Sequence, residues 1–523
     1  MTSTDTGSTT GVRGPVTRAR RSARSVLSVR SVRRVPGAVL VLAGALSPWA
    51  SVVLPGGAYP DLATLHLFDA PHLVTGFRLH LVLLGLAALL PRAARPAGAG
   101  VLIIAFVHTA FLAALGAVSF GGPVALAGGA LLVWQGRREP APRWPLPGRA
   151  VVWPALAAAF AGLLWLVSAT LTAGGQSRAT NPHGGAEFLA FLGFAVALLG
   201  ILSAYGVLAW LSALAERHRT FSVAVLLGCA MLLPLTGAGT GYWMTVASTI
   251  GVYAATAIGL NIVVGLAGLL DLGYVAFLGI GAFTAANLAH TVPFPVAALA
   301  GAVAAGLLGV VVGAPTLRVR GDYLAIVTLA FGEIFFRAAQ NDLGGLTGGA
   351  NSIPGIPPIT LFGQAFDRPV GALPAGFLYY ALTVLMVAGA MAVLANLKHS
   401  RTGRAWLAIS ADEDVARAMG VHTGRAKILA FLVGATLAGL AGAVFAHKLG
   451  TVGYESFDFS ESVTLLAAVI LGGMGTVPGA VVGASLLFVL PEKLREFSDY
   501  RLMLFGLALI LIMRLRPKGL VSS

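Results

Sequence analysis

Long apolar segments recur along the whole chain, each about 20 residues long and bounded by polar residues, glycine or proline. The clear segments cover residues 36–55, 98–118, 150–172, 188–214, 243–268, 274–290, 294–314, 375–397, 426–447 and 500–515. Weaker ones cover 78–91, 121–135, 221–236 and 323–337, and a broken pair, expected to be re-entrant, covers 462–474 and 478–490. Because a run of this length fits one helical crossing of a bilayer, the pattern predicts an all-α polytopic membrane protein with roughly 14–16 transmembrane helices.

The composition supports a membrane location. Hydrophobic residues make up 57% of the 523 residues, and only 20 residues are Asp or Glu. The net charge of +15 comes from Lys and Arg scattered through many short connections. This distribution favours membrane topology and contact with anionic lipids over nucleic-acid binding. The single cysteine, Cys229, excludes an internal disulfide and a thiolate metal site, so no metal is expected.

The positive residues also predict the orientation of the chain. The first 35 residues hold eight Arg and one acidic residue. With one crossing per segment, the other basic clusters fall on the same side: Arg92 and Arg95, 137–149, Arg217 and Arg219, Arg318 and Arg320, 398–427, and Arg514, Arg516 and Lys518. By the positive-inside rule we expect both termini in the cytoplasm and segments 56–76 and 173–187 outside. A signal peptide is an alternative interpretation of the Arg-rich start.

The stretch SADEDVARAMG (410–420) is the one place where acidic residues follow one another directly. It lies in a polar connection, 398–425, between two apolar segments. Ser410 and Glu413 have the spacing of a capping box, and Asp412, Glu413 and Asp414 suit the positive end of a helix dipole. Arg417 suits the last turn and Gly420 a C-terminal stop. The pattern predicts a short cytoplasmic helix, about 411–419.

So short a helix needs a partner surface, because few hydrogen bonds offset the cost of nucleation. Val415 and Met419 share one face, and Trp406 and Ile409 are expected to form a second apolar patch on the cytoplasmic side. One interpretation is a coupling helix that inserts into a cleft on another protein. The alternative is a helix that packs beneath its own membrane domain.

Motifs of ATP hydrolysis and of hydrolase chemistry are absent from the sequence. There is no Gly-x-x-x-x-Gly-Lys-[Ser/Thr] loop, no His-Glu-x-x-His and no Gly-x-Ser-x-Gly. The chain is therefore not expected to be an enzyme or to hydrolyse ATP itself. Membrane location without a catalytic set favours transport.

Several runs in order resemble the permease subunits of branched-chain amino-acid ABC importers, the LivM type. They are TAIGLNIVVGLAGLLDLGYVAFLGIGAFTAA (256–286), RVRGDYLAIVTLAFGEIFFR (318–337), LTGGANSIPGIP (346–357), RTGRAWLAISADEDVARAMGV (401–421), AAVILGGMGTVPGAVVGA (467–484) and RPKGL (516–520). The resemblance covers roughly 240–523. It implies an ABC importer permease in the cytoplasmic (inner) membrane of a bacterium, carrying branched-chain or other hydrophobic amino acids.

The resemblance also implies partners. They are a second homologous permease subunit, two cytoplasmic ABC ATPases that use ATP and magnesium, and an extracytoplasmic solute-binding protein; no cofactor is expected in this chain. The cytoplasmic loop is the ATPase contact in this family, and Asp414, Ala416, Arg417, Ala418 and Gly420 carry its pattern. The sequence departs from the general importer pattern, with Asp-Val-Ala in place of Glu-Ala-Ala and no later proline. The residues expected to couple to the ATPase are Trp406, Ser410, Asp412, Glu413, Asp414, Val415, Ala416, Arg417, Met419 and Gly420.

Polar residues in the apolar segments are candidates for the substrate path. Asn261 and Asp271 lie in a glycine-rich stretch that favours either close helix packing or a broken helix with exposed backbone groups. Glu333 and Arg337 stand at i, i+4, where they either mark a pathway or form a local pair with Arg337 snorkelling near Gln340. Thr328 precedes them on the same predicted helix.

The chain divides into three expected parts: a basic cytoplasmic tail (1–35), an N-terminal membrane extension of about six helices (36–215), and the permease domain (221–523). The long connection 338–374 is expected outside, as a docking surface for a binding protein or a cap over the pore. His108, within an apolar segment, is interpreted as a core residue. A urea or short-amide ABC permease and an ATP-independent carrier remain alternatives, and a membrane enzyme fits less well.

Overall fold

A computed structural model of the protein describes residues 34–47, 77–114, 118–136, 149–172, 184–315 and 322–493, apart from residues 362 and 372, with isolated positions elsewhere. The predicted basic tail, the segment 56–76, most of 173–187 and the predicted span 500–515 lie largely outside the described residues. The chain forms two compact units, Met1–Val223 and Ala224–Ser523, here called unit 1 and unit 2. The boundary falls inside a helix, α10 (Arg219–Leu232).

Unit 1 is a bundle of apolar helices with its own core. Before α10 its described helices are α2 (Val35–Leu46), α4 (Phe77–Ala88), α5 (Ala94–Ala114), α6 (Gly121–Gln135), α7 (Arg149–Thr172), α8 (Gly184–Ala204) and α9 (Val207–Arg217). Leu84, Val101 and Leu132 are fully or almost fully buried between them. His108 is buried and stacks on Phe77 with ring centroids 3.9 Å apart, which confirms that it is a core residue.

One predicted span of unit 1 is wrong as a single helix. The segment predicted at 188–214 consists of α8 and α9, separated at Gly206, which has φ +73°. The indole Nε1 of Trp144 donates to the carbonyl oxygen of Tyr205 at 2.7 Å, next to this break. An unbroken apolar run therefore does not exclude a turn where a glycine adopts the left-handed conformation.

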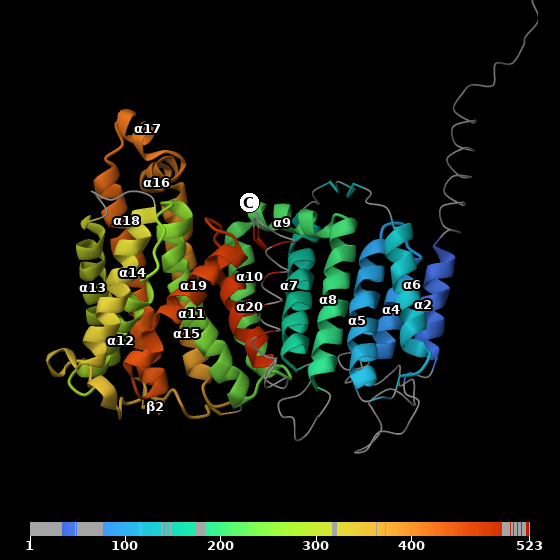
Figure 1. The fold of residues 1–523 in the computed structure, drawn as a ribbon, viewed down its shortest axis with the longest axis horizontal. Helices are drawn as coiled ribbons and strands as arrows, with labels where there is room; N and C mark the ends of the chain where they lie inside the picture. The colour runs from blue at the N-terminus through green and yellow to red at the C-terminus, as the bar shows by residue number, and fades with distance from the viewer. Residues whose placement is uncertain are drawn as a thin grey trace, which may run out of the picture. The chain divides into compact units, whose positions relative to one another are not determined.

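Unit 2 contains a helical bundle (Figure 1). Its α- and π-helices after α10 are α11 (Gly241–Leu260), η2 (a π-helix, Asn261–Leu266), α12 (Val275–Leu288), α13 (Phe294–Gly313), α14 (Asp322–Gln340), α15 (Phe377–His399), α16 (Arg401–Ala411), α17 (Glu413–Ala418), α18 (Thr423–Leu449), α19 (Phe459–Gly472) and α20 (Gly479–Lys493). Short 3₁₀ turns are η1 (Leu233–Leu235), η4 (Leu343–Gly345), η5 (Gly349–Asn351) and η6 (Tyr454–Phe457).

Helices α16 and α17 lie at one end of unit 2, and the long connection 341–376 lies at the other (Figure 1). We call these the α17 end and the β end. The β end carries a two-stranded antiparallel hairpin, β1 (Thr360–Leu361) and β2 (Gln364–Ala365), the one sheet among the described residues.

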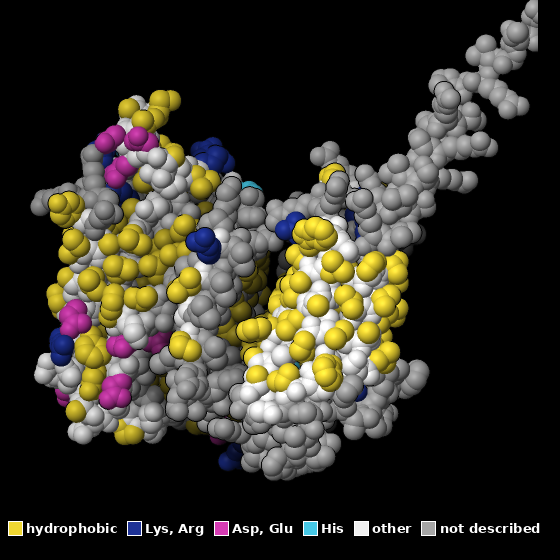
Figure 2. All heavy atoms as spheres, turned by 45° about the vertical axis from the view of Figure 1, so that its right-hand side comes forward, with side chains coloured by type: hydrophobic (Ala, Val, Ile, Leu, Met, Phe, Trp, Pro, Cys, Tyr) yellow, Lys and Arg dark blue, Asp and Glu magenta, His cyan; other side chains and the backbone are white. Residues whose placement is uncertain are grey.

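The expectation of an all-α polytopic membrane protein is confirmed. In the described part of the chain, eight helices are long and apolar enough to cross a membrane, and five further apolar helices are shorter. On the visible face, hydrophobic side chains cover much of the helix flanks, while the acidic side chains of unit 2 lie at the α17 end and in the half toward the β end (Figure 2). This distribution is the one expected of helices whose flanks meet lipid or other apolar helices.

Glycine brings the backbones of α12, α13 and α18 into contact. A Cβ atom on Gly281 of α12 would come 2.1 Å from the carbonyl oxygen of Gly439 in α18, and one on Gly442 would come 2.0 Å from that of Leu278. A Cβ on Gly439 would meet the Cβ of Ala305 in α13 at 2.5 Å. Small residues at helix crossings allow this close approach in membranes.

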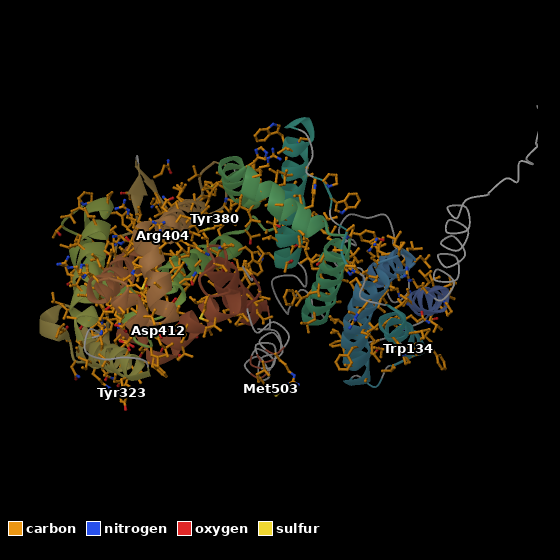
Figure 3. The ribbon with its side chains drawn as sticks, turned by 90° about the horizontal axis from the view of Figure 1, so that it is seen from above. Trp134, Tyr323, Tyr380, Arg404, Asp412 and Met503 are labelled. Atoms are coloured by element: carbon orange, nitrogen blue, oxygen red, sulfur yellow. The ribbon has the colours of Figure 1, made fainter. Side chains whose placement is uncertain are left out.

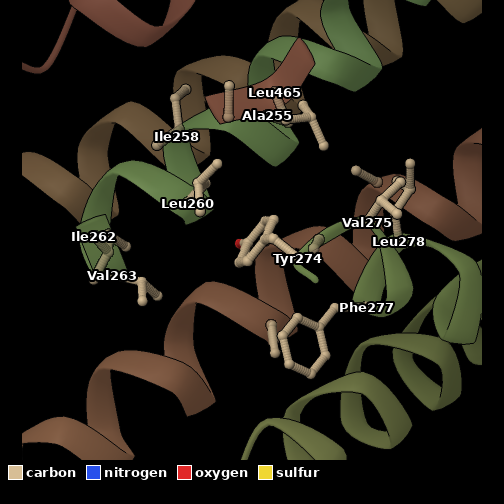
Figure 4. Close-up of a cluster of buried hydrophobic side chains, with 14 of the residues drawn as sticks. Ala255, Ile258, Leu260, Ile262, Val263, Tyr274, Val275, Phe277, Leu278 and Leu465 are labelled. Carbon is tan, nitrogen blue, oxygen red and sulfur yellow. The ribbon is translucent and has the colours of Figure 1, made fainter. Parts of the chain in front are cut away.

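The core of unit 2 surrounds the junction between α11 and α12. Tyr274 is fully buried and projects among Leu260, Val275 and Phe277 (Figure 4). Its hydroxyl donates to the carbonyl oxygen of Gly434 in α18 at 2.6 Å. One hydrogen bond thus fixes the start of α12 against α18.

The predicted broken pair 462–474 and 478–490 corresponds to α19 and α20, joined by a turn at 473–478. This turn lies near the last turn of α15, because Lys398 Nζ donates to the carbonyl oxygen of Gly475 at 2.8 Å. Since α16 follows α15 directly, the turn is at the α17 end. Whether the pair is re-entrant in a bilayer stays a prediction.

Candidate functional site

The α17 end is built from two helices rather than the single helix predicted at about 411–419. Helix α16 runs through Ser410, whose hydroxyl donates to the carbonyl oxygen of Leu407 at 3.0 Å. The chain is extended at Asp412 (φ −163°, ψ 114°), and its carboxylate accepts from the backbone N–H groups of Asp414 at 2.9 Å and Val415 at 3.0 Å. The capping box from Ser410 to Glu413 is therefore wrong, and Asp412 is the N-cap.

Glu413 faces two basic side chains instead of the cap. Its Oε1 lies 3.0 Å from Arg417 Nη2, and its Oε2 lies 2.6 Å from Lys427 Nζ in α18. The Lys427 side chain is only 3% exposed, and that of Glu413 is 19% exposed. Sequence reasoning counted Lys427 only as part of a positive cluster, because nothing local pairs it with a residue 14 positions earlier.

The tip of α17 presents apolar side chains to the outside. Val415 is 59% exposed and Met419 is 80% exposed, as the predicted shared face requires. Gly420 follows with φ +85°, and its N–H donates to the carbonyl oxygen of Arg417, which confirms the predicted stop. Figure 3 labels Asp412 and Arg404 among the helices of unit 2. Exposed apolar side chains beside charged ones fit a surface that another protein covers.

Trp406 and Ile409 do not add to this exposed surface, and the prediction of a second exposed patch is wrong. Trp406 is fully buried and Ile409 is 6% exposed. The Trp406 indole Nε1 donates to the carbonyl oxygen of Ala426 in α18 at 2.7 Å. Ala416 of α17 is also buried. Trp406, Ile409 and Ala416 thus belong to the hydrophobic core of unit 2.

Asn261 lies where α11 changes to a π-helix. It is fully buried; its Nδ2 donates to the carbonyl oxygen of Thr476, and its Oδ1 accepts from the N–H of Gly475, both at 2.8 Å. Gly475 also accepts from Lys398. One turn therefore joins α11, α15 and the α19–α20 pair. Because both ends of the Asn261 amide are occupied, the packing interpretation of Asn261 accounts for its position in this structure.

The chain is not helical between η2 and α12, as the broken-helix interpretation of this stretch requires. Asp271 lies in this break and is 1% exposed. Its Oδ1 accepts from the N–H of Gly273 at 2.9 Å, whereas its Oδ2 is buried with no hydrogen-bond partner among the described residues. Thr328 of α14 is buried opposite, and its Oγ1 accepts from the N–H of Leu272 at 3.1 Å. The structure thus brings Asp271 and Thr328 to the same break.

Glu333 and Arg337 lie elsewhere on α14. Arg337 Nε and Glu333 Oε1 are 2.8 Å apart, which confirms the local pair. Both side chains are exposed, that of Arg337 at 61% and that of Glu333 at 51%. Arg337 also donates to Gln340 Oε1 at 3.0 Å. The five candidate path residues therefore divide into a buried group (Asn261, Asp271 and Thr328) and an exposed pair.

Neither group has the composition of a catalytic or metal centre. Within the residues that the structure describes, no three His, Cys, Asp or Glu side chains are grouped to hold a metal ion. The arrangement consists of the protruding short helix α17, contacts that link the α17 end to α18, and the non-helical break between η2 and α12.

Comparison with known proteins gives a family match over unit 2. Residues 242–513 match a family model described as the branched-chain amino acid transport system / permease component. The high-affinity branched-chain amino acid transport system permease protein LivM of Escherichia coli is 39% identical over 327 residues, which are 58% of this chain and 75% of the relative. LivM of Salmonella typhimurium is 41% identical over 292 residues, 52% of this chain and 68% of the relative.

A second type of permease matches more weakly. LivH of Salmonella typhimurium is 28% identical over 134 residues, which are 25% of this chain and 43% of the relative. No solved structure matches the chain.

Proposed function

The chain belongs to the family of branched-chain amino acid transport permeases, and from this premise we propose that it is the transmembrane permease subunit of an ATP-binding-cassette importer for branched-chain or other hydrophobic amino acids. The observation that carries this proposal is the 39% identity to a LivM permease over three-quarters of that protein. Among the described residues of unit 2, five helices are long and apolar enough to cross a membrane, and they provide the required scaffold.

The second part of the proposal is that α17 docks on a cytoplasmic ATPase. Its support is the exposure of Val415 and Met419 on a helix too short to be stable without surrounding contacts. ATP and magnesium would act in the partner ATPases, and this chain would respond to them by movement of α17.

This assignment also orients the chain. With α17 in the cytoplasm, the β end faces outward, and the basic residues around α16 and α17 follow the positive-inside rule. The long connection at the β end is then available to an extracytoplasmic solute-binding protein. We place the protein in the inner membrane of a bacterium, with both termini in the cytoplasm.

We further propose that the importer pairs this chain with a second, homologous permease and with two ATPases. The similarity of part of this chain to LivH as well as LivM supports a paired permease system. The exposed Glu333–Arg337 pair would lie on a face that is not lined by lipid alone, since ionisable groups on membrane helices are costly to expose to hydrocarbon.

For the substrate path, we propose the break around Asp271 and Thr328. A buried carboxyl oxygen without a hydrogen-bond partner is costly to maintain in a membrane helix bundle, and such groups often mark a pathway. Residues 36–215 are proposed as a membrane extension outside the transport unit.

The test is uptake of radiolabelled leucine, with urea in parallel, by vesicles containing this chain and its partner proteins. Uptake is measured with and without internal ATP and binding protein. Leucine uptake that requires both would support the proposal. Urea uptake alone would keep the importer mechanism and change the substrate, and flux without ATP through this chain alone would contradict the importer.

A further inference from the structure

A partly buried ion pair connects the short helix α17 to the membrane helix α18. Lys427 is in the second turn of α18, and Glu413 is the first residue of α17. Their Nζ and Oε2 atoms are 2.6 Å apart. Lys427 is the less exposed partner, with 3% of its side chain accessible. Glu413 therefore points toward the membrane helices and away from the exposed tips of Val415 and Met419.

Stability alone does not account for these charges. Burying two charges has a desolvation cost that their attraction often only balances, and an apolar pair of similar volume is frequently as stable. What an ion pair adds is a fixed geometry between two elements. Here Arg417 completes the geometry, with its Nη2 3.0 Å from Glu413 Oε1 and 3.3 Å from Thr423 Oγ1, in the first turn of α18.

A second link reaches α18 from α16. The Trp406 indole donates to the carbonyl oxygen of Ala426, the residue directly before Lys427. Two side chains on two different helices thus hold adjacent residues of α18. The α16–α17 corner has little freedom to move without moving the start of α18.

Helix α18 in turn contacts the rest of unit 2 without intervening side chains. Its Gly439 and Gly442 touch the backbone of α12, as described above. Its Gly434 accepts the hydrogen bond of Tyr274 at the start of α12, three residues after Asp271. A displacement of α18 therefore reaches the break in the chain at 267–274.

We propose that Glu413 and Lys427 are positioning residues that transmit movement of α17 into α18, so that ATP hydrolysis in the partner drives opening of the transport path. This inference rests on the proposed importer function. It separates the residues of α17 into two roles: Val415 and Met419 bind the partner, and Glu413 passes the movement inward.

The experiment uses the complete importer reconstituted in vesicles. For each variant we measure co-purification of the ATPases, the rate of ATP hydrolysis with leucine and binding protein present, and leucine uptake. The decisive quantity is leucine transported per ATP hydrolysed. Lys427→Met, which keeps an unbranched side chain only one atom shorter and removes its charge, is expected to retain the ATPases and hydrolysis but to lower this ratio at least about tenfold.

A double-mutant cycle gives the second arm. Glu413→Gln alone is expected to lower the ratio as Lys427→Met does, and Glu413→Gln combined with Lys427→Met is expected to lower it little further, because both changes remove the same ion pair. Lys448→Met is the control: Lys448 is also a lysine of α18 and is half-buried, but its Nζ donates to the carbonyl oxygen of Thr245 and the hydroxyl of Thr249 in α11. This control is expected to keep the ratio.

The outcomes separate the two proposals. If the unmodified importer shows no ATP-dependent leucine uptake, the proposed function is wrong. If it transports normally and Lys427→Met has an unchanged ratio, the transmission role is wrong. Loss of the ATPases from Lys427→Met would also overturn it, because the pair would then serve docking. A double variant whose loss equals the product of the two single losses would do the same, because the two residues would then act independently.

Discussion

Gly268 and Ser410 are in direct contact, and no side chain fits between them: a Cβ atom on Gly268 would come 2.8 Å from the Cβ atom of Ser410. Gly268 follows the π-helix at the end of α11, and Ser410 belongs to the last turn of α16. The α17 end therefore abuts the point where the membrane helix breaks.

We expect Gly268→Ala to destabilise the protein more than an alanine at a comparable glycine elsewhere. Gly268 has φ +70°, which costs an L-residue about 1–2 kcal/mol, and the contact with Ser410 adds about 1–3 kcal/mol. Gly363→Ala is the control, because Gly363 has φ +80° and open space around it. Denaturant unfolding of the purified chain in micelles measures the free energy of unfolding of both variants. Equal losses of stability would show that the contact with Ser410 is not the cause.

The two candidate caps of α17 give opposite expectations. Asp412→Ala should weaken α17 by about 1 kcal/mol, because the backbone N–H groups of Asp414 and Val415 lose their acceptor. Ser410→Ala should have little effect, since its hydroxyl only bonds within α16. Hydrogen exchange of the α17 amides distinguishes the two variants. Faster exchange in Ser410→Ala would support Ser410, and not Asp412 alone, as the cap of α17.

The proposed docking of α17 is tested by placing charges on its exposed apolar residues, Val415 and Met419. Val415→Asp with Met419→Asp is expected to abolish co-purification of the ATPases and ATP-dependent leucine uptake, because two carboxylates on exposed tips would be buried without partners. The unfolding transition of the chain should be unchanged. Leu343→Asp, at the exposed β end, is the control and should keep the ATPases. Normal uptake by the double variant would contradict the docking role of α17.

Asn261 is expected to be important for stability whatever its part in transport. Asn261→Ala leaves the buried N–H of Gly475 and carbonyl of Thr476 without this partner, which should cost about 2–4 kcal/mol of unfolding free energy. Asn287→Ala is the control, because Asn287 also donates to two carbonyl oxygens but is exposed, so water replaces it. Similar losses in the two variants would show that the Asn261 contacts are not the cause.

Substitution of Glu333 distinguishes a role in the substrate path from a local ion pair with Arg337. In the isolated chain, Glu333→Gln should change the unfolding free energy by less than about 1 kcal/mol, because the pair is exposed. Kinetics of leucine uptake by the assembled importer then decide its role. An altered KM or kcat would keep Glu333 in the pathway, and unchanged values would leave a local pair.

Relationships within one helix could be predicted from the sequence. The Glu333–Arg337 pair, the exposed face of Val415 and Met419, and the stop at Gly420 all follow from helical spacing or from the conformation that glycine allows. The apolar runs likewise predicted most of the membrane helices, because length and hydrophobicity alone decide whether a segment suits a bilayer.

The cap of α17 shows where local reasoning reaches its limit. Ser410 and Asp412 are both residue types that cap helices, and Glu413 completes a capping box only with Ser410. In the structure α16 continues through Ala411, so Ser410 lies inside it and Asp412 is the first extended residue. Trp406 of the same helix is held against α18 by a tertiary contact, about which the spacing of the sequence contains no information.

Long-range contacts were beyond prediction for the same reason. Asn261 bonds to Thr476, 215 positions later, and Lys427 pairs with Glu413 across a turn between two helices. Periodicity reports which face of a helix is apolar, but it does not report which distant backbone group a buried amide will meet.

The glycine contacts among α12, α13 and α18 limit how unit 2 can change shape. Backbones that touch directly cannot slide past one another without overlap, so these three helices form one solid block. A non-helical joint adjoins this block at residues 267–274. Alternation between two open states would then be a rotation of the block about this joint, with few intermediate positions, rather than a gradual deformation of the bundle.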